Sequence, residues 1–198
     1  MTGALEVADV PSPIGLFRLA YEERVVRVID LVEPGAPQTG VPAGALRRRP
    51  PFRAGSPPAA LREYFRDGRQ AFDIEVAPES TSEFDRKVWE MLRRVTAGST
   101  VTSGELARRS GYPGAARAVG GAMGRNPIPI VIPCHRVVGE SGSMQGYGLG
   151  LWRKRWLLDH EGAWPLRSRS AEGPRPGGQR TLDGHAPARP GSSRRRAT

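Results

Sequence analysis

Three prolines within seven residues constrain the backbone around residue 130 more tightly than any other feature of the sequence. Residues 126–137 read NPIPIVIPCHRV. Proline fixes φ and lacks an amide hydrogen, so this stretch excludes an α-helix and a central strand. We therefore expect an extended, rigid segment that delivers Cys134 in a fixed direction.

Cys134 is the single cysteine of the 198 residues. One cysteine cannot form an internal disulfide or supply the thiolates of a structural zinc site. It is either a small buried apolar residue or a reactive thiol. The adjacent His135 does not by itself indicate a base, because neighbours on an extended chain point to opposite sides. The reactive interpretation gains support from the distant pair His160-Glu161, which follows a helix expected over residues 152–159.

The formal net charge of +10 suggests a polyanionic partner, but most of the excess lies in the last 34 residues. Residues 165–198 hold eight arginines against Glu172 and Asp183, a net +6 that leaves +4 for the other 164 residues. This tail is rich in Gly, Pro, Ser and Arg, and we expect it to be disordered. It is either a solvated extension or a source of non-specific attraction to phosphates.

No apolar run approaches the roughly 20 residues of a bilayer span, and residues 1–10 do not have the pattern of a signal peptide. We therefore expect a soluble, cytoplasmic protein with no membrane partner.

The first part of the chain predicts a small α/β domain over residues 1–79, made of a small antiparallel sheet plus a helix. Residues 13–20 and 25–32 are β-rich runs around a turn at 21–24 and indicate a hairpin. Residues 33–58 are rich in Pro, Gly and Arg and indicate a loop or crossover, in which the arginines at 47–49 are more typical of a solvated surface than of a binding site. Residues 59–67 have the spacing of a short amphipathic helix.

Residues 80–164 predict a mainly α, winged-helix-like DNA-binding domain with a helix-turn-helix. Thr81 or Ser82 can cap a first helix that Gly98 stops. A second helix begins near Ser103 and ends at residues 110–114, and a third runs over residues 115–125. Together they have the outline of a helix-turn-helix. The apolar face of the first helix consists of Phe84, Val88, Trp89, Leu92 and Val95.

The third of these helices is almost without side-chain bulk, since residues 115–125 include four alanines and three glycines. Each glycine costs roughly 1 kcal/mol relative to alanine, so some close approach must require them. The helix either packs tightly against another helix or presses against a nucleic acid. Arg117 favours a nucleic-acid surface, because so thin a helix can enter a narrow groove.

The segment 126–138, followed by Tyr147 and by KRWLLDHEG at 154–162, resembles the active-site region of the O6-alkylguanine-DNA alkyltransferases, or methylated-DNA–protein-cysteine methyltransferases. The likeness extends back through RAVGGAM at 117–123 to Phe84 and Trp89, more weakly to residues 13–15, and covers about residues 10–164. It implies DNA repair by irreversible, single-turnover transfer of an alkyl group from O6 of guanine, and also from O4 of thymine, to Cys134. It further implies a monomer without cofactor or metal, acting on double-stranded DNA that contains O6-alkylguanine.

The resemblance assigns catalytic roles to four residues. It implies that His135 takes the proton of Cys134 through a bound water, while Glu161 orients the imidazole and stabilises its charge, as in a Cys-His-acid triad. Asn126 would hold the turn that carries Cys134 by hydrogen bonds to backbone groups.

The resemblance also implies a mode of DNA binding with base flipping. The small-residue helix would enter the minor groove, with Arg117 filling the gap left by the extruded base. Backbone groups of Cys134 and Val137 would contact the exocyclic amine, and the Gly148 N–H would contact O6. The remaining residues expected at the DNA or the base are Thr102, Ser103, Tyr147, which walls the pocket, and Lys154, near Cys134 and Tyr147.

Two positions depart from the family's pattern. Ser103 stands where the family usually has a tyrosine whose phenol is thought to donate a hydrogen bond or proton at N3 of the base. Serine is shorter and a weaker acid, so it would act through a water, or Tyr112 would substitute for it. Gly148 stands where serine is frequent, but the contact implied there is through the backbone.

Three other functions compete with repair. Alkyltransferase-like proteins bind the same lesion without repairing it and have a different residue at the cysteine position. A Cys-His hydrolase would require an oxyanion hole and would turn over. A helix-turn-helix regulator would leave Cys134 dispensable.

Overall fold

The computed structural model describes residues 4–33, 45–68, 72–78 and 81–163. The chain divides into one unit comprising Met1–Arg167 and another comprising Ser168–Thr198. The expected disorder of residues 165–198 and the expected domain boundary at 79–80 lie outside the described residues, as do residues 34–44 of the expected loop.

Three antiparallel strands form the centre of a sheet: β1 (Glu6–Ser12), β2 (Gly15–Glu22) and β3 (Val25–Val32). The hairpin predicted over residues 13–32 is confirmed as β2 and β3, and its turn places Glu23 at φ 52°. The sequence did not lead us to expect β1, although Val7, Ala8 and Val10 bury apolar side chains in the core.

Short parallel strands at both edges make this sheet mixed, so the expectation of a purely antiparallel sheet is wrong. The strand order is β4-β1-β2-β3-β5, in which β4 (Leu46–Arg48) runs parallel to β1 and β5 (Glu75–Val76) runs parallel to β3. Parallel neighbours require a crossover connection, and residues 33–58 and helix α1 provide the lengths of chain needed. Arg47 and Arg48 of β4 are exposed and pair with Asp9 and Glu6.

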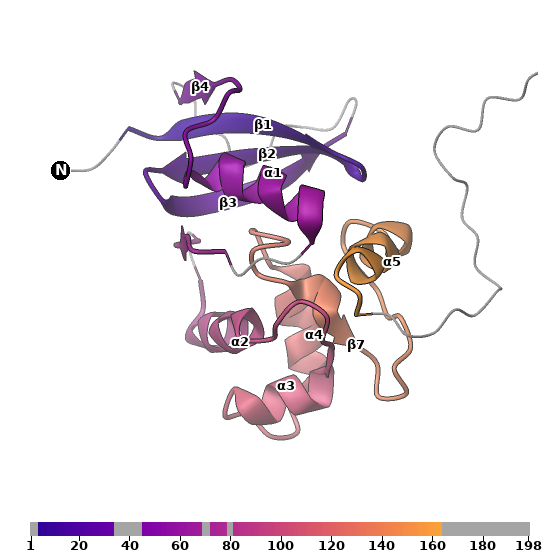
Figure 1. The fold of residues 1–198 in the computed structure, drawn as a ribbon. Coiled ribbons are helices and arrows are strands. Elements are labelled where there is room, and N and C mark those ends of the chain that lie inside the picture. The colour runs from indigo at the N-terminus through magenta and orange to yellow at the C-terminus, as the bar shows by residue number, and fades with distance from the viewer. Residues whose placement is uncertain (1–3, 34–44, 69–71, 79–80, 164–198) are drawn as a thin grey trace, which may run out of the picture. The chain divides into compact units, whose positions relative to one another are not determined.

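Helix α1 (Pro57–Asp67) packs on β1 and β2 (Figure 1). Prolines occupy its first two positions, where the missing amide hydrogens have no helical partner in any case. Its buried face includes Leu61, Tyr64 and Phe65, and Phe65 stacks on Phe17 of β2 with ring centroids 5.6 Å apart. The helix ends at Gly68, whose φ of 70° suits glycine.

Helix α2 (Glu83–Arg93) is capped by Ser82, whose hydroxyl accepts a hydrogen bond from the Asp85 amide. It buries Val88, Trp89 and Leu92, as the apolar spacing predicts. The expectation that it runs to Gly98 is wrong, because Val95 N donates to Leu92 O, a tighter i+3 bond that closes the last turn.

The following helices agree with the predicted ones within a residue or two at each end: α3 (Ser103–Arg109), α4 (Ala116–Gly124) and α5 (Leu151–His160). A two-stranded parallel sheet joins β6 (Val101–Thr102) to β7 (Val137–Val138). The winged-helix character of this part stays a prediction.

The proline-rich segment before Cys134 is a turn, so the expectation of an extended segment is wrong. The Ile132 amide donates to the Ile128 carbonyl at 2.9 Å, and Ile130 has a φ of 75°. A single 3-10 turn, η1 (Cys134–Arg136), follows at once. Proline excludes ladder hydrogen bonds but is compatible with turns, so the same residues that prevent a strand allow the chain to fold back.

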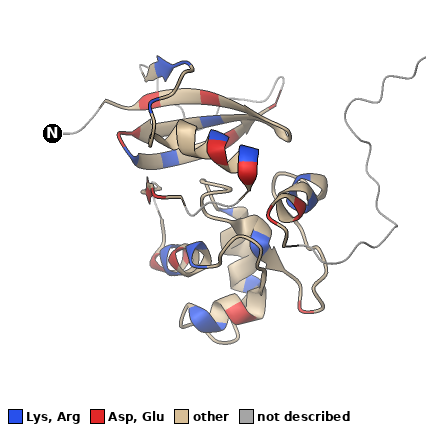
Figure 2. Ribbon diagram, in the orientation of Figure 1, with Lys and Arg blue, Asp and Glu red and all other residues tan. Residues whose placement is uncertain are grey.

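No helix in the described part of the chain is long and apolar enough to cross a membrane. Figure 2 shows acidic and basic residues interspersed along α1 and α2 rather than gathered by sign.

Candidate active site

Cys134 lines a pocket of about 320 Å³ between α3, α4, β7 and the start of α5. Five of the residues expected at the DNA or the base line it too: Ser103, Val137, Tyr147, Gly148 and Lys154. The other lining residues are Gly120, Met123, Gly124, Val138, Gln145 and Gly146.

Asn126 fixes the turn that carries Cys134. Its Nδ2 donates to the Ile132 carbonyl at 2.8 Å and to Cys134 Sγ at 3.1 Å. Its Oδ1 accepts from the Ile128 amide at 3.0 Å. One side chain therefore satisfies backbone groups on both arms of the turn and contacts the sulfur as well.

His135 lies fully buried directly after Cys134, with its Nε2 2.9 Å from Glu161 Oε1. Burial alone would raise the pKa of Glu161, but hydrogen bonds from His135 and Arg136 outweigh it and lower that pKa to about 2. Since a carboxylate can only accept, Nε2 carries the hydrogen and Nδ1 keeps the lone pair. Nδ1 is buried and has no partner among the described residues, and burial lowers the pKa of His135, so the imidazole is neutral near pH 7 and free to accept a proton.

Arg136 is a part of this site that sequence reasoning missed. Its Nε donates to Glu161 Oε2 at 2.9 Å and its Nη2 to Oε1 at 2.8 Å, while Nη1 donates to the Val95 carbonyl. A two-point pair of this kind fixes the plane of the carboxylate and balances its charge. The available signal was the position of Arg136 within Pro-Cys-His-Arg-Val, but nothing in the sequence pointed to Glu161 as its partner.

The Cys134 thiol is protonated at neutral pH. Burial raises its pKa to about 11, although the Asn126 hydrogen bond acts in the opposite direction. The thiolate is the nucleophilic form, so this sulfur requires a group that removes its proton during the reaction.

Lys154 is buried and donates to two carbonyls, Val137 O at 2.6 Å and Gln145 O at 3.0 Å. Burial lowers its pKa to about 8. Its ammonium group therefore ties β7 to the loop before α5 and places a positive charge at the pocket wall.

Three comparisons agree on the relatives of this chain. The family model of the 6-O-methylguanine DNA methyltransferase DNA-binding domain matches residues 83–163. The methylated-DNA–protein-cysteine methyltransferase of Methanosarcina acetivorans is 41% identical over 152 residues, covering 77% of this chain and 95% of the relative. That of Mycolicibacterium paratuberculosis is 44% identical over 154 residues, covering 78% and 90%. The chain belongs to the methylated-DNA–protein-cysteine methyltransferase family.

Solved structures of the same family share the fold. The O6-methylguanine methyltransferase of Mycobacterium tuberculosis is 36% identical, with a TM-score of 0.67 over 80% of this chain and 93% of the other. The structure of that organism's protein in complex with DNA matches at a TM-score of 0.65 and 33% identity, with the same coverage.

Thr102 and Ser103, at the start of α3, have different positions relative to the pocket. Ser103 lines the pocket, whereas Thr102 caps the helix, accepting a hydrogen bond from the Glu105 amide at 3.2 Å. Tyr112 packs on Phe84, with ring centroids 4.8 Å apart, and does not line the pocket. Tyr112 is therefore not placed to take the role that the resemblance gives to a tyrosine at position 103.

Helix α4 is attached by one face and bare on the other. Trp89 Nε1 donates to the Ala122 carbonyl at 3.0 Å, which holds the helix against α2. Arg117 is exposed, and a Cβ built on Gly120 or Gly124 would meet nothing within 4 Å. Packing against a helix in the described part of the chain therefore does not explain these glycines.

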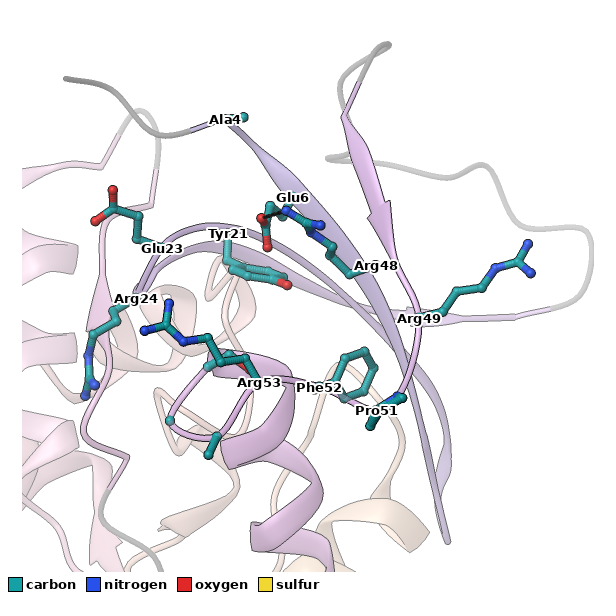
Figure 3. Close-up of a pocket in the computed structure, with 13 residues that line it drawn as sticks. Ala4, Glu6, Tyr21, Glu23, Arg24, Arg48, Arg49, Pro51, Phe52 and Arg53 are labelled. Atoms are coloured by element: carbon teal, nitrogen blue, oxygen red, sulfur yellow. Dashed lines mark hydrogen bonds and ion pairs between the residues drawn. The ribbon is translucent and has the colours of Figure 1, made fainter.

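A second, larger cavity of about 830 Å³ lies beside β1, β4 and the start of α1 (Figure 3). Four arginines line it, but Arg48 pairs with Glu6 and Arg24 with Asp73. In Figure 3, Arg49 extends away from the Arg48–Glu6 pair. Two of the four arginines of this cavity are thus paired with carboxylates, and among its lining residues there is no nucleophile comparable to Cys134.

Among the described residues, no group of three or more His, Cys, Asp or Glu side chains is placed to hold a metal ion. The groups gathered around Cys134 are those of an acid-base and nucleophilic site.

Proposed function

We propose that this chain repairs DNA by transferring a methyl or larger alkyl group from O6 of guanine, and also from O4 of thymine, to Cys134. The observation that carries the proposal is a single thiol at a pocket wall, followed by a buried neutral imidazole whose Nδ1 is free and whose Nε2 is held by Glu161. Relatives of 41% and 44% identity over most of their length carry the name of this activity.

The proposed step balances without a cofactor. Cys134 Sγ forms a bond to the alkyl carbon while the bond from that carbon to O6 breaks, and the electron pair stays on the guanine. The thiol proton leaves through a water to His135 Nδ1, and the guanine anion takes up one proton to become normal guanine. Arg136 keeps Glu161 ionised, which stabilises the imidazolium that forms. The thioether product is stable, so each molecule acts once.

DNA would meet the bare face of α4. A helix lined by glycine and alanine can enter the minor groove closely, and Arg117 on that face would replace the extruded base in the stack. This use explains why α4 retains Gly120 and Gly124 although they are not needed for packing within the described chain. A winged-helix-like arrangement of residues 80–164 is part of what we propose for DNA binding.

The extruded base would occupy the pocket beside Cys134. Backbone groups of Cys134 and Val137 would receive the exocyclic amine, the Gly148 amide would donate to O6, and Tyr147 would form a wall. Lys154 holds the two segments that supply these groups through its bonds to Val137 and Gln145. Thr102 would act only by starting α3, which brings Ser103 to the pocket.

Intact mass measurement tests the reaction. After incubation with a duplex bearing O6-methylguanine, we expect a stoichiometric gain of one methyl group on Cys134, and none in Cys134→Ala. Binding of the lesion without a mass change would replace the proposal with lesion sensing. Repeated turnover would indicate a hydrolase, and an unimpaired Cys134→Ala variant would indicate a regulator.

Arg117→Ala tests the flipping role. We expect transfer from duplex DNA to slow by at least tenfold while transfer from the free base O6-benzylguanine is unchanged, because only the duplex requires a base to be extruded. Arg66→Ala, an exposed arginine of α1, is the matched control and should leave both rates unchanged. Equal losses on both substrates would contradict the role given to Arg117.

A further inference from the structure

Tyr64 of α1 reaches the proposed catalytic carboxylate from a distant part of the sequence. It is fully buried, and its hydroxyl donates to Glu161 Oε1 at 2.7 Å across 97 positions of sequence. Burial first, and then the charge of Glu161, raise the pKa of the Tyr64 phenol, whereas Glu161 remains ionised. The phenol is therefore the donor and the carboxylate the acceptor at neutral pH.

The oxygen that Tyr64 contacts is the one that holds His135. Glu161 Oε1 accepts hydrogen bonds from Tyr64 Oη, His135 Nε2 and Arg136 Nη2, whereas Oε2 accepts from Arg136 Nε. Each added donor stabilises the charge on Oε1, lowers its proton affinity and so weakens its hold on the imidazole hydrogen. The Tyr64 hydroxyl is thus placed to adjust how readily His135 gains and keeps a proton.

The backbone of Tyr64 holds the same region. Its carbonyl accepts from His160 Nε2 at 2.8 Å and from the Gly68 amide at 2.8 Å. A Cβ on Gly68 would clash with the His160 carbonyl, so the glycine allows the end of α1 to lie directly against the end of α5. The contacts of Tyr64 and Gly68 with His160 therefore hold Tyr64 close to Glu161, the next residue of the chain.

We infer that Tyr64 is a positioning residue for alkyl transfer, acting through Glu161 on the orientation and proton affinity of His135. The first third of the chain then acts on the reacting centre through Glu161. The inference rests on the proposed function, since it assigns His135 the role of proton acceptor.

Titratable or charged groups from every neighbouring element face the His135–Glu161 pair: Cys134 and Arg136 of η1, Lys154 of α5, Tyr147 of the preceding loop and Tyr64 of α1. Arg136 and Lys154 are cations that disfavour protonation of His135, and Glu161 favours it. Removing only the Tyr64 hydroxyl leaves these charges in place and strengthens the pull of Glu161 on the imidazole hydrogen.

Tyr64→Phe is the test, read by single-turnover transfer from an O6-methylguanine duplex over a range of pH. The rate should fall about tenfold at pH 7.5, because Glu161 loses a hydrogen bond that fixes its orientation and therefore that of His135. The acid limb of the profile should move to higher pH, because His135 must be neutral to accept the thiol proton and its pKa rises in the variant. The affinity for the duplex should not change.

Tyr21→Phe is the matched control. Tyr21 is another buried tyrosine of the same half of the chain, and its hydroxyl bonds to the carboxylate of Glu6, away from Cys134. Tyr21→Phe removes the same kind of hydrogen bond as Tyr64→Phe. The Tyr21 variant should therefore lose similar stability but keep the parent rate and pH profile.

Replacing Tyr64 with 3-fluorotyrosine keeps the side chain in place and makes its phenol a stronger donor. The acid limb should then move to lower pH, opposite to the effect of phenylalanine, which tests the inference even where Tyr64→Phe fails to fold. An acid limb that stays in place in the fluorinated protein would overturn the inference. Failure of the parent chain to take up the methyl group would instead refute the proposed function.

Discussion

Burial determines what Cys134 can do. A thiol with a pKa near 11 is almost entirely protonated at neutral pH, so the sulfur is unreactive until a neighbour accepts its proton. His135 is placed for this because Glu161 fixes its tautomer, and Glu161 in turn is held by Arg136 and Tyr64. The reactivity proposed for Cys134 thus depends on four other residues that do not touch the alkyl group.

Ser103 lines the pocket with a hydroxyl where the resemblance to the family implies a phenol. We expect Ser103→Tyr to increase the rate of methyl transfer at least tenfold, because a proton donor near N3 stabilises the departing base. Ser103→Phe is the matched control, since it adds the same bulk without the hydroxyl. Single-turnover rates on an O6-methylguanine duplex measure both.

The same pair of variants separates chemistry from space. Both side chains should reduce transfer from O6-benzylguanine, because either ring fills part of the 320 Å³ pocket. Equal methyl-transfer rates in the tyrosine and phenylalanine variants would show that the hydroxyl contributes nothing at this position.

The ionisation of Glu161 makes the free energy of unfolding depend on pH. Its folded pKa of about 2 lies below the ordinary 4.5, so its contribution to stability is complete above pH 4.5 and is lost as the pH falls towards 2. We expect Glu161→Gln to lower the free energy of unfolding by about 3–5 kcal/mol at pH 7, because Arg136 is left buried without its anion. The deficit should shrink as the pH is lowered below 4.5.

Urea unfolding at several pH values measures this deficit. Glu90→Gln is the control, because Glu90 is an exposed partner of Arg86 on α2 and should show almost no deficit at any pH. A deficit in Glu161→Gln that is the same at pH 7 and pH 3 would argue against an ionised Glu161.

At the scale of elements, the sequence predicted those features that depend on residues close to one another in the chain. The hairpin, the Ser82 cap and helices α1 to α5 followed from side-chain periodicity and turn residues. The edge strands β4 and β5 did not, since three-residue and two-residue strands exist only through pairing with β1 and β3. The turn before Cys134 was also missed, because its geometry depends on the Asn126 side chain bonding across six and eight positions.

The site shows the same limit. Cys134, His135 and Asn126 lie within ten consecutive residues, 126–135, and their grouping was visible in the sequence together with the distant Glu161. Tyr64 was not, because within α1 it has the spacing of an ordinary core residue and nothing local marks its hydroxyl. Partners brought together only by the packing of α1 against α5 carry no signal in a single sequence.

Helix α4 should tolerate bulk in the free protein but not on DNA. We expect Gly120→Leu to keep or raise the thermal midpoint, since a Cβ there meets nothing within 4 Å and leucine favours a helix by up to about 1 kcal/mol over glycine. Transfer from duplex DNA should fall at least tenfold, because the added side chain holds the helix away from the groove. Thermal unfolding and single-turnover rates measure the two effects.

Gly120→Ala provides a graded comparison, with a similar gain in stability and a much smaller loss of transfer. A leucine variant that repairs duplex DNA at the parent rate would show that this face of α4 does not contact DNA.

At the scale of the whole molecule, the buried apolar residues of the described chain form one core cluster, which draws on both halves proposed from the sequence. Besides the Tyr64–Glu161 bond, the Ile29 amide of β3 donates to the Pro127 carbonyl at 2.9 Å, and Arg153 of α5 donates to the Ile14 carbonyl at 2.9 Å. The central sheet therefore supports both the turn before Cys134 and the helix that precedes Glu161.

Most of the net charge lies in a part of the sequence outside the described residues. The arginines of residues 165–198 account for most of the net +10. Replacing all eight of them with glutamine lowers the net charge to +2, that is, 10 minus 8. We expect weaker binding to undamaged duplex at low salt and a shallower dependence of affinity on salt, by about 0.9 in the log–log slope for each phosphate that the variant leaves unneutralised. The transfer rate at saturating DNA should not change, because the reacting groups lie between Asn126 and Glu161.

The salt dependence decides between the two interpretations of these arginines. A shallower slope means that the segment neutralises phosphates and raises the residence of the protein on DNA, so repair at limiting DNA would slow while repair at saturating DNA would not. An unchanged slope means that the arginines are only solvated. In that case the charge that attracts DNA must come from residues 1–164, whose net +4 is small enough that close fit at α4, rather than long-range attraction, would dominate binding.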